Sequence, residues 1–127
     1  MKKGILIASI FACSMNVFGQ NKSAQSCGSG CYFVTASTKS SEQCTDKSGR
    51  SYTISNKTIE SLDIQLYVEK KQGGWESLGL FNDVAAGKVL TDATWSCGAT
   101  GRYILYYRKS GSTDKFPSNS DVSSYAR

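Results

Sequence analysis

The 127-residue sequence contains no histidine, and this absence excludes a large part of enzyme chemistry. Without an imidazole there is no Ser-His-Asp or Cys-His catalysis and no histidine ligand for a metal ion. No Ser-x-x-Lys segment stands out as the centre of an alternative nucleophile. We therefore expect a protein that is not an enzyme and that binds no metal or cofactor.

Long apolar runs are also scarce. Beyond the amino terminus no run approaches the ~20 residues of a transmembrane helix, so we expect no membrane span. Residues 1–19 begin with a positive segment, Met1-Lys2-Lys3, and continue as an apolar stretch too short to cross a bilayer. They indicate a secretory signal peptide that is cleaved before Gln20, which predicts a secreted or periplasmic protein.

Cys13 provides an alternative interpretation of this signal. Residues 10–13 (Ile-Phe-Ala-Cys) resemble a lipoprotein box, in which an acylated Cys13 would anchor the chain to the outer membrane. Phe11 is an unusual residue in such a box, and cleavage there leaves a very short apolar core. Cleavage before Gln20 is therefore the favoured hypothesis, and an outer-membrane lipoprotein is the alternative.

Four further cysteines, an even number in a short exported chain, predict two disulfides. We favour the pairs Cys31–Cys97 and Cys27–Cys44, because Cys31 opens one predicted strand and Cys97 precedes another. A redox pair at Cys27 and Cys31 is disfavoured because three flexible residues separate them. A zinc site is disfavoured because Cys44 and Cys97 are far apart in sequence.

Positive charge is present but not concentrated. The formal net charge is +5, and removal of Lys2 and Lys3 with the signal peptide leaves +3. This mild balance suits solubility but lacks the basic cluster typical of nucleic-acid binding. We expect no nucleic-acid partner.

Leu62–Lys70 carries the clearest secondary-structure pattern. Four apolar residues at every second position alternate with Asp63, Gln65, Tyr67 and Glu69, which predicts a strand with one buried and one water-facing side. Gly73 and Gly74 then supply the backbone freedom for a hairpin. The same reasoning predicts strands at 31–37, 50–55, 62–70, 75–81, 89–95 and 102–108.

The last of these strands, Arg102–Arg108, has apolar side chains on both faces, so we expect a central strand with a layer on each side. Residues 20–30 predict a flexible lead-in, residues 31–109 the folded domain and residues 110–127 a polar C-terminal tail. In the tail, a short helix is expected near Ser118, with Phe116 and Tyr125 as candidate anchors. The predicted fold class is a small all-β antiparallel sandwich of about six strands, stapled by disulfides.

Aromatic residues provide the candidate binding site. Trp95 adjoins Cys97, and a tryptophan packed on a disulfide is typical of a sandwich core. Four other side chains are candidates for an exposed patch: Tyr67, Trp75, Tyr106 and Arg108. Such a patch combines apolar area with hydrogen-bonding tips and suits a protein or glycan ligand. The competing interpretation is that scattered tyrosines cover a small core.

Three functional hypotheses follow from these features. The leading one is an exported, non-enzymatic binding or interaction module of the cell envelope or extracellular space. The second is an inhibitor or immunity-type protein that blocks an envelope-acting enzyme with a disulfide-rigidified loop at residues 38–49. The third and most remote is a carboxylate-based hydrolase that uses two of the residues Asp63, Glu69, Glu76, Asp83 and Asp92.

Overall fold

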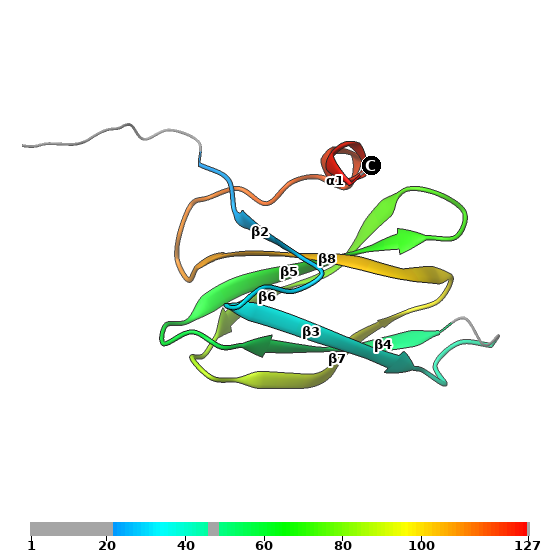
Figure 1. Cartoon of the computed structure of the whole chain (residues 1–127), viewed down its shortest axis with the longest axis horizontal. Helices are drawn as coiled ribbons and strands as arrows, with labels where there is room; N and C mark the ends of the chain where they lie inside the picture. Colours follow the sequence, from blue (N-terminus) through cyan, green and yellow to red (C-terminus); the bar gives the residue numbers. More distant parts are fainter. Residues whose placement is uncertain (1–21, 46–48, 127) are drawn as a thin grey trace, which may run out of the picture.

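Two antiparallel sheets pack face to face in the computed structural model, which describes residues 22–45 and 49–126 (Figure 1). One sheet has the strand order β2-β8-β5-β6 and the other β3-β4-β7. The predicted signal peptide and Cys13 lie outside the described residues. The elements are β2 (Gln25–Gly28), β3 (Val34–Ser40), β4 (Arg50–Asn56), β5 (Leu62–Lys70), β6 (Trp75–Val84), β7 (Val89–Ser96), β8 (Ala99–Lys109) and α1 (Asn119–Tyr125).

The core between the sheets follows the period-two pattern of the sequence. On β5, Leu62, Ile64, Leu66 and Val68 are all buried in one cluster with side chains of β4 and β8. Alternate side chains of a strand point to opposite faces, so this spacing directs all four to the same side. The predicted all-β fold and the inner face of β5 are confirmed.

A second core lies on the other face of the four-stranded sheet. Its buried members are Ala24, Tyr67, Trp75, Tyr106 and Val122, with Phe116 packed against them. β8 pairs with β2 and β5 and has one core on each side, as its two-sided apolar pattern predicts.

The outer face of β5 was expected to meet water, and there the prediction is wrong. Asp63 and Tyr67 are buried because residues after β8 fold back over the sheet. The segment expected to be a polar tail therefore supplies part of the second core through Phe116 and Val122, whereas Tyr125 stays exposed.

Helix α1 closes this layer and begins where the sequence indicates. Ser118 caps its first turn: its hydroxyl accepts from the Asp121 backbone N–H at 3.1 Å, and the Asp121 carboxylate accepts from the Ser118 N–H. The helix also serves the sheet: Asn119 accepts from the Ser77 N–H and Ser123 from the Trp75 N–H, at 3.0 and 3.1 Å. Both donors belong to β6, the last strand of its sheet, so α1 satisfies backbone groups of an otherwise open edge.

The amino-terminal segment also differs from expectation. Residues 25–28 form β2 and pair with β8 instead of leading flexibly into the domain. Just before β2, the Ala24 N–H donates to the Lys115 carbonyl at 2.8 Å, and the Lys115 N–H donates to the Lys22 carbonyl at 3.0 Å. Side-chain composition concealed this strand, because its pairing is carried by the backbone.

Two disulfides are present as predicted, but their pairing is Cys27–Cys31 and Cys44–Cys97. Gly28 and Gly30 adopt positive φ values of 56° and 143°, so the chain turns back on itself between the first pair. Cys44 lies in the connection from β3 to β4, and Cys97 directly follows β7, which pairs with β4. The predicted pairing is wrong because this strand neighbourhood, absent from the sequence pattern, places Cys44 beside Cys97.

Candidate functional site

The structure brings the predicted patch together but buries it. Tyr67, Trp75 and Tyr106 all belong to the second core, beneath α1 and the segment before it. Arg108 is mostly covered, with Nε 2.8 Å from Asp63 Oδ2 and its guanidinium 4.8 Å from the Phe116 ring centre. Their expected exposure is therefore wrong, and these residues hold the C-terminal segment in place.

The ionisation of the two tyrosines agrees with a structural role. Burial, followed by the neighbouring Tyr106 and Asp121, raises the pKa of Tyr67 to about 12. Burial also raises the pKa of Tyr106. Both phenols are therefore neutral at physiological pH, and the Tyr67 hydroxyl donates to the Pro117 carbonyl.

Asp63 is the most enclosed of the carboxylates proposed for a hydrolase. Burial acts to raise the pKa of its carboxyl group, but bonds from the Asp83 N–H, Arg108 and Ser110 outweigh burial and lower the pKa. Three others form ion pairs: Glu69 with Arg102, Glu76 with Lys70, and Asp92 with Lys39. These contacts favour structural roles for all four groups.

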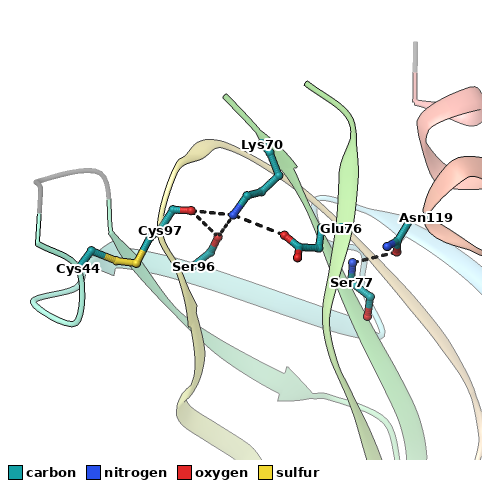
Figure 2. A network of polar contacts seen from close by, with 7 residues as sticks. All are labelled: Cys44, Lys70, Glu76, Ser77, Ser96, Cys97 and Asn119. Atoms are coloured by element: carbon teal, nitrogen blue, oxygen red, sulfur yellow. Dashed lines mark hydrogen bonds and ion pairs between the residues drawn. A yellow bond between two sulfur atoms is a disulfide. The ribbon is translucent and has the colours of Figure 1, made fainter. Parts of the chain in front are cut away.

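Lys70 and Ser96 form a pair that the sequence did not indicate (Figure 2). Lys70 Nζ lies 3.3 Å from Ser96 Oγ, a separation that a Ser-Lys nucleophile would also show. The same nitrogen lies 2.6 Å from the Cys97 carbonyl and 3.5 Å from Glu76 Oε1. An ammonium group has three donors, and these three acceptors engage all of them, so no lone pair is directed at the serine. The geometry favours a structural role, in which Lys70 links β5 to the end of β7 beside the Cys44–Cys97 disulfide.

An open apolar groove of about 430 Å³ lies at one end of the sandwich. Tyr32 and Ile59 form its rim, with 84% and 96% of their surfaces exposed, and Phe33 is 48% exposed. Isolated apolar residues are common on surfaces, whereas a contiguous apolar group is a candidate contact site. We call this feature the Tyr32 groove; its lining residues are Tyr32, Phe33, Lys57, Thr58, Ile59, Glu60, Leu62, Tyr107 and Lys109.

Two loops form the groove, and backbone contacts hold them together. The first connects β2 to β3 and is closed by the Cys27–Cys31 disulfide. The second connects β4 to β5, and its Lys57 N–H donates to the Phe33 carbonyl at 2.9 Å. The Phe33 ring also lies 6.2 Å from the ring of Tyr107 on β8. Three separate parts of the fold therefore support the groove, namely the β2–β3 loop, the β4–β5 loop and strand β8.

Asn56 fixes the second loop from inside. This residue is buried, and its side-chain amide donates to the carbonyls of Val84 and Glu60 at 2.8 and 2.9 Å. Its Oδ1 accepts from the Thr58 N–H at 2.9 Å. These bonds shape the turn that directs Ile59 outward, because they satisfy the polar groups that the turn leaves unpaired.

The charged groups of the groove are positive in balance. Lys57 and Lys109 line it together with one carboxylate, that of Glu60. Glu60 Oε1 lies 3.8 Å from Lys109 Nζ, so its charge is already compensated.

Sequence reasoning missed this groove. The predicted strand at 31–37 includes Tyr32 and Phe33, whereas β3 starts at Val34 and leaves both rings in a loop. Ile59, an isolated apolar residue within a polar turn, was the available signal. The prediction that Trp95 packs in the core is wrong: its side chain is 51% exposed on β7, an edge strand of the three-stranded sheet.

No family model matches the chain, and comparison with curated proteins and with solved structures finds no match. Within residues 22–45 and 49–126, no cluster of three or more potential ligand residues could hold a metal ion. The same residues contain no helix that is long and apolar enough to cross a bilayer. Two disulfides are typical of an oxidising compartment outside the cytoplasm.

Proposed function

We propose that this protein is an exported, non-enzymatic binding module of the cell envelope or extracellular space, and that the Tyr32 groove is its contact site. The observation that carries the proposal is the exposure of Tyr32 and Ile59 on two loops that are linked to each other. A preformed apolar surface binds at a lower entropy cost than a flexible one. The disulfide at Cys27–Cys31 supports such preorganisation.

The composition of the groove indicates the chemistry of its ligand. Five of the nine lining residues are aromatic or aliphatic, namely Tyr32, Phe33, Ile59, Leu62 and Tyr107. Sugars require many directed hydrogen bonds in addition to ring stacking, whereas this lining offers mainly apolar contact. The groove therefore favours a partner that presents apolar groups.

The alternative of an inhibitor with a rigid loop at residues 38–49 has less support. Residues 46–48 lie outside the described part of the chain, and the described part of the loop contributes no residue to the groove. Cys44 does tether this loop to Cys97.

Retention of envelope components on the immobilised mature protein tests the proposal. We expect the wild-type domain to retain material that a Tyr32→Ser/Ile59→Ser variant does not. Trp95→Ser is the matched control, because it removes an exposed aromatic side chain from β7 instead. Equal retention by the wild type and the double variant would refute the groove as the contact site.

Export is tested separately by intact-mass analysis of the mature protein. A chain that starts at Gln20 supports cleavage of the signal peptide. A chain that starts at Cys13 with added acyl mass would establish the lipoprotein alternative.

A further inference from the structure

We propose that the partner of the Tyr32 groove is the surface of an anionic lipid bilayer. This inference rests on the proposed binding function and names the partner of the same site. It identifies the protein as a peripheral membrane-binding domain that inserts one end of its sandwich at the level of the lipid headgroups.

The apolar rim of the groove projects into water. Ile59 is 96% exposed and Tyr32 is 84% exposed, so both side chains project into solvent. The Tyr32 ring meets the Phe33 ring edge-on, with centres 5.6 Å apart. Projecting apolar side chains suit insertion into a lipid bilayer, whereas a small soluble ligand usually binds in a concave pocket that encloses most of its surface. Tyrosine is favoured where a bilayer meets water, because its ring is apolar and its hydroxyl is polar.

The charges that flank the groove are complementary to an anionic lipid surface. The side chain of Lys109 is 76% exposed, and Lys57 is also exposed beside the apolar rim. With Glu60 paired to Lys109, the groove keeps an excess of positive charge. Lysines flanking inserted apolar groups are attracted to anionic headgroups, whereas a neutral bilayer gives no such gain.

Hydrogen bonds and a disulfide fix the two loops that form the groove. An exposed isoleucine on a mobile loop would collapse onto the nearest apolar surface. The turn that carries Ile59 is fixed by buried Asn56, and the neighbouring loop is fixed by the Cys27–Cys31 disulfide and the Lys57–Phe33 backbone bond. The fold therefore holds apolar side chains in water at one end, where they are available to a membrane.

The arrangement of the fold gives this surface a direction. The connection from β4 to β5 lies at the left end of the sandwich in Figure 1, and the connection from β2 runs back to the same end, where β3 starts. Trp95 lies near the other end of β7, paired opposite Ser51. Docking through the groove thus directs the long strands along the membrane normal and leaves Trp95 in water.

Vesicle flotation tests this inference with the mature protein and three variants. The probes are vesicles of phosphatidylcholine alone and vesicles with about one third phosphatidylglycerol. The variants are Tyr32→Ser/Ile59→Ser, Lys57→Gln/Lys109→Gln and the control Trp95→Ser. All three change exposed side chains, and a thermal midpoint measured for each variant checks that it is folded.

We expect the wild type to float with the anionic vesicles and to bind neutral vesicles at least about tenfold more weakly. The apolar double variant should lose at least about tenfold in partitioning. The lysine double variant should bind both vesicle types equally, and Trp95→Ser should match the wild type.

Absence of flotation with anionic vesicles overturns the inference, and so does equal flotation of the wild type and the apolar variant. If the groove is still needed to retain soluble protein from the envelope, the lipid assignment fails while the binding function stands. If neither vesicles nor envelope components depend on the groove, both proposals fail.

Discussion

The hydroxyl of Tyr67 donates a hydrogen bond to the carbonyl oxygen of Pro117, although the two residues are separated by 50 positions in the chain. The bond joins the outer face of β5 to the segment that leads into α1. The Tyr67 ring also packs against Tyr106, with centres 5.4 Å apart. This contact explains why a side chain that alternates with apolar residues lies buried instead of facing water.

Tyr52 provides the natural comparison for Tyr67. Both rings are fully buried, but the Tyr52 hydroxyl has no hydrogen-bond partner among the described residues. We expect Tyr67→Phe to lower the free energy of unfolding by about 1 kcal/mol, since it leaves the Pro117 carbonyl unpaired. Tyr52→Phe should be neutral or slightly stabilising. Urea denaturation of the two variants measures the difference, and equal losses would contradict the role given to the Pro117 bond.

Alkaline pH should destabilise the fold through the same tyrosine. The pKa of Tyr67 is about 12 in the folded protein against a model value of 10.0, so the unfolded chain loses this proton first. The stabilisation is complete below pH 10 and is lost as the pH rises to 12, with a slope of at most about 1.4 kcal/mol per pH unit per group. Burial also raises the pKa values of Tyr52 and Tyr106, which act in the same direction. Tyr67→Phe should flatten the measured dependence of unfolding free energy on pH; an unchanged slope would exclude this origin.

The Asp63–Arg108 pair should matter on the acid side. Asp63→Asn removes the charge that faces Arg108, and we expect a loss of about 2 kcal/mol because the guanidinium keeps little water in exchange. Glu60→Gln is the control, since its 3.8 Å pair with Lys109 is exposed and should contribute less than about 0.5 kcal/mol.

The pKa of Asp63 is lowered in the folded state, so its contribution is present above the unfolded pKa and disappears as the pH falls through the folded one. Unfolding titrations between neutral pH and strong acid should therefore be flatter for Asp63→Asn than for the wild type. Parallel curves for the two proteins would show that the pair does not act this way.

The two disulfides should differ in their contribution to stability. Cys44 and Cys97 are 53 residues apart, and Cys27 and Cys31 are four apart. In the chain-entropy model the longer loop stabilises by about 4 kcal/mol and the shorter one by about 2 kcal/mol. Thermal unfolding of the two double-serine variants checks this order, and non-reducing peptide mapping checks the pairing. A peptide that joins Cys31 to Cys97 would restore the pairing predicted from sequence alone.

Local sequence determined most of the regular elements. The alternation in Leu62–Lys70 predicts a strand because side chains in a strand alternate between its two faces. Gly73 and Gly74 predict a tight turn because such turns need positive φ values, and both glycines adopt them. The start of α1 directly after its N-cap, Ser118, likewise depends on bonds within a few residues. Such features are readable because the interactions that make them lie close together in the chain.

The candidate site could not be read in this way. Tyr32 and Phe33 have strand-like composition, and only the actual start of β3 at Val34 leaves them exposed. Tyr67 and Trp75 are residue types that also occur in exposed binding patches. They are buried here only because the segment after β8 folds back and covers them. The same side-chain types were thus assigned to opposite environments, because exposure depends on which distant segment arrives to cover a face.

The sequence by itself determined an all-β chain, an even set of cysteines beyond Cys13, and a central strand that needs a layer on each side. Tertiary structure decided which cysteines meet, since pairing depends on the strand neighbourhood that places Cys44 beside Cys97. It also decided where apolar side chains remain in water, since Ile59 is directed outward by bonds from Asn56 to chain segments as far away as Val84. Period and capping are local properties, whereas pairing and burial arise from contacts between segments far apart in sequence, and only the folded chain specifies those contacts.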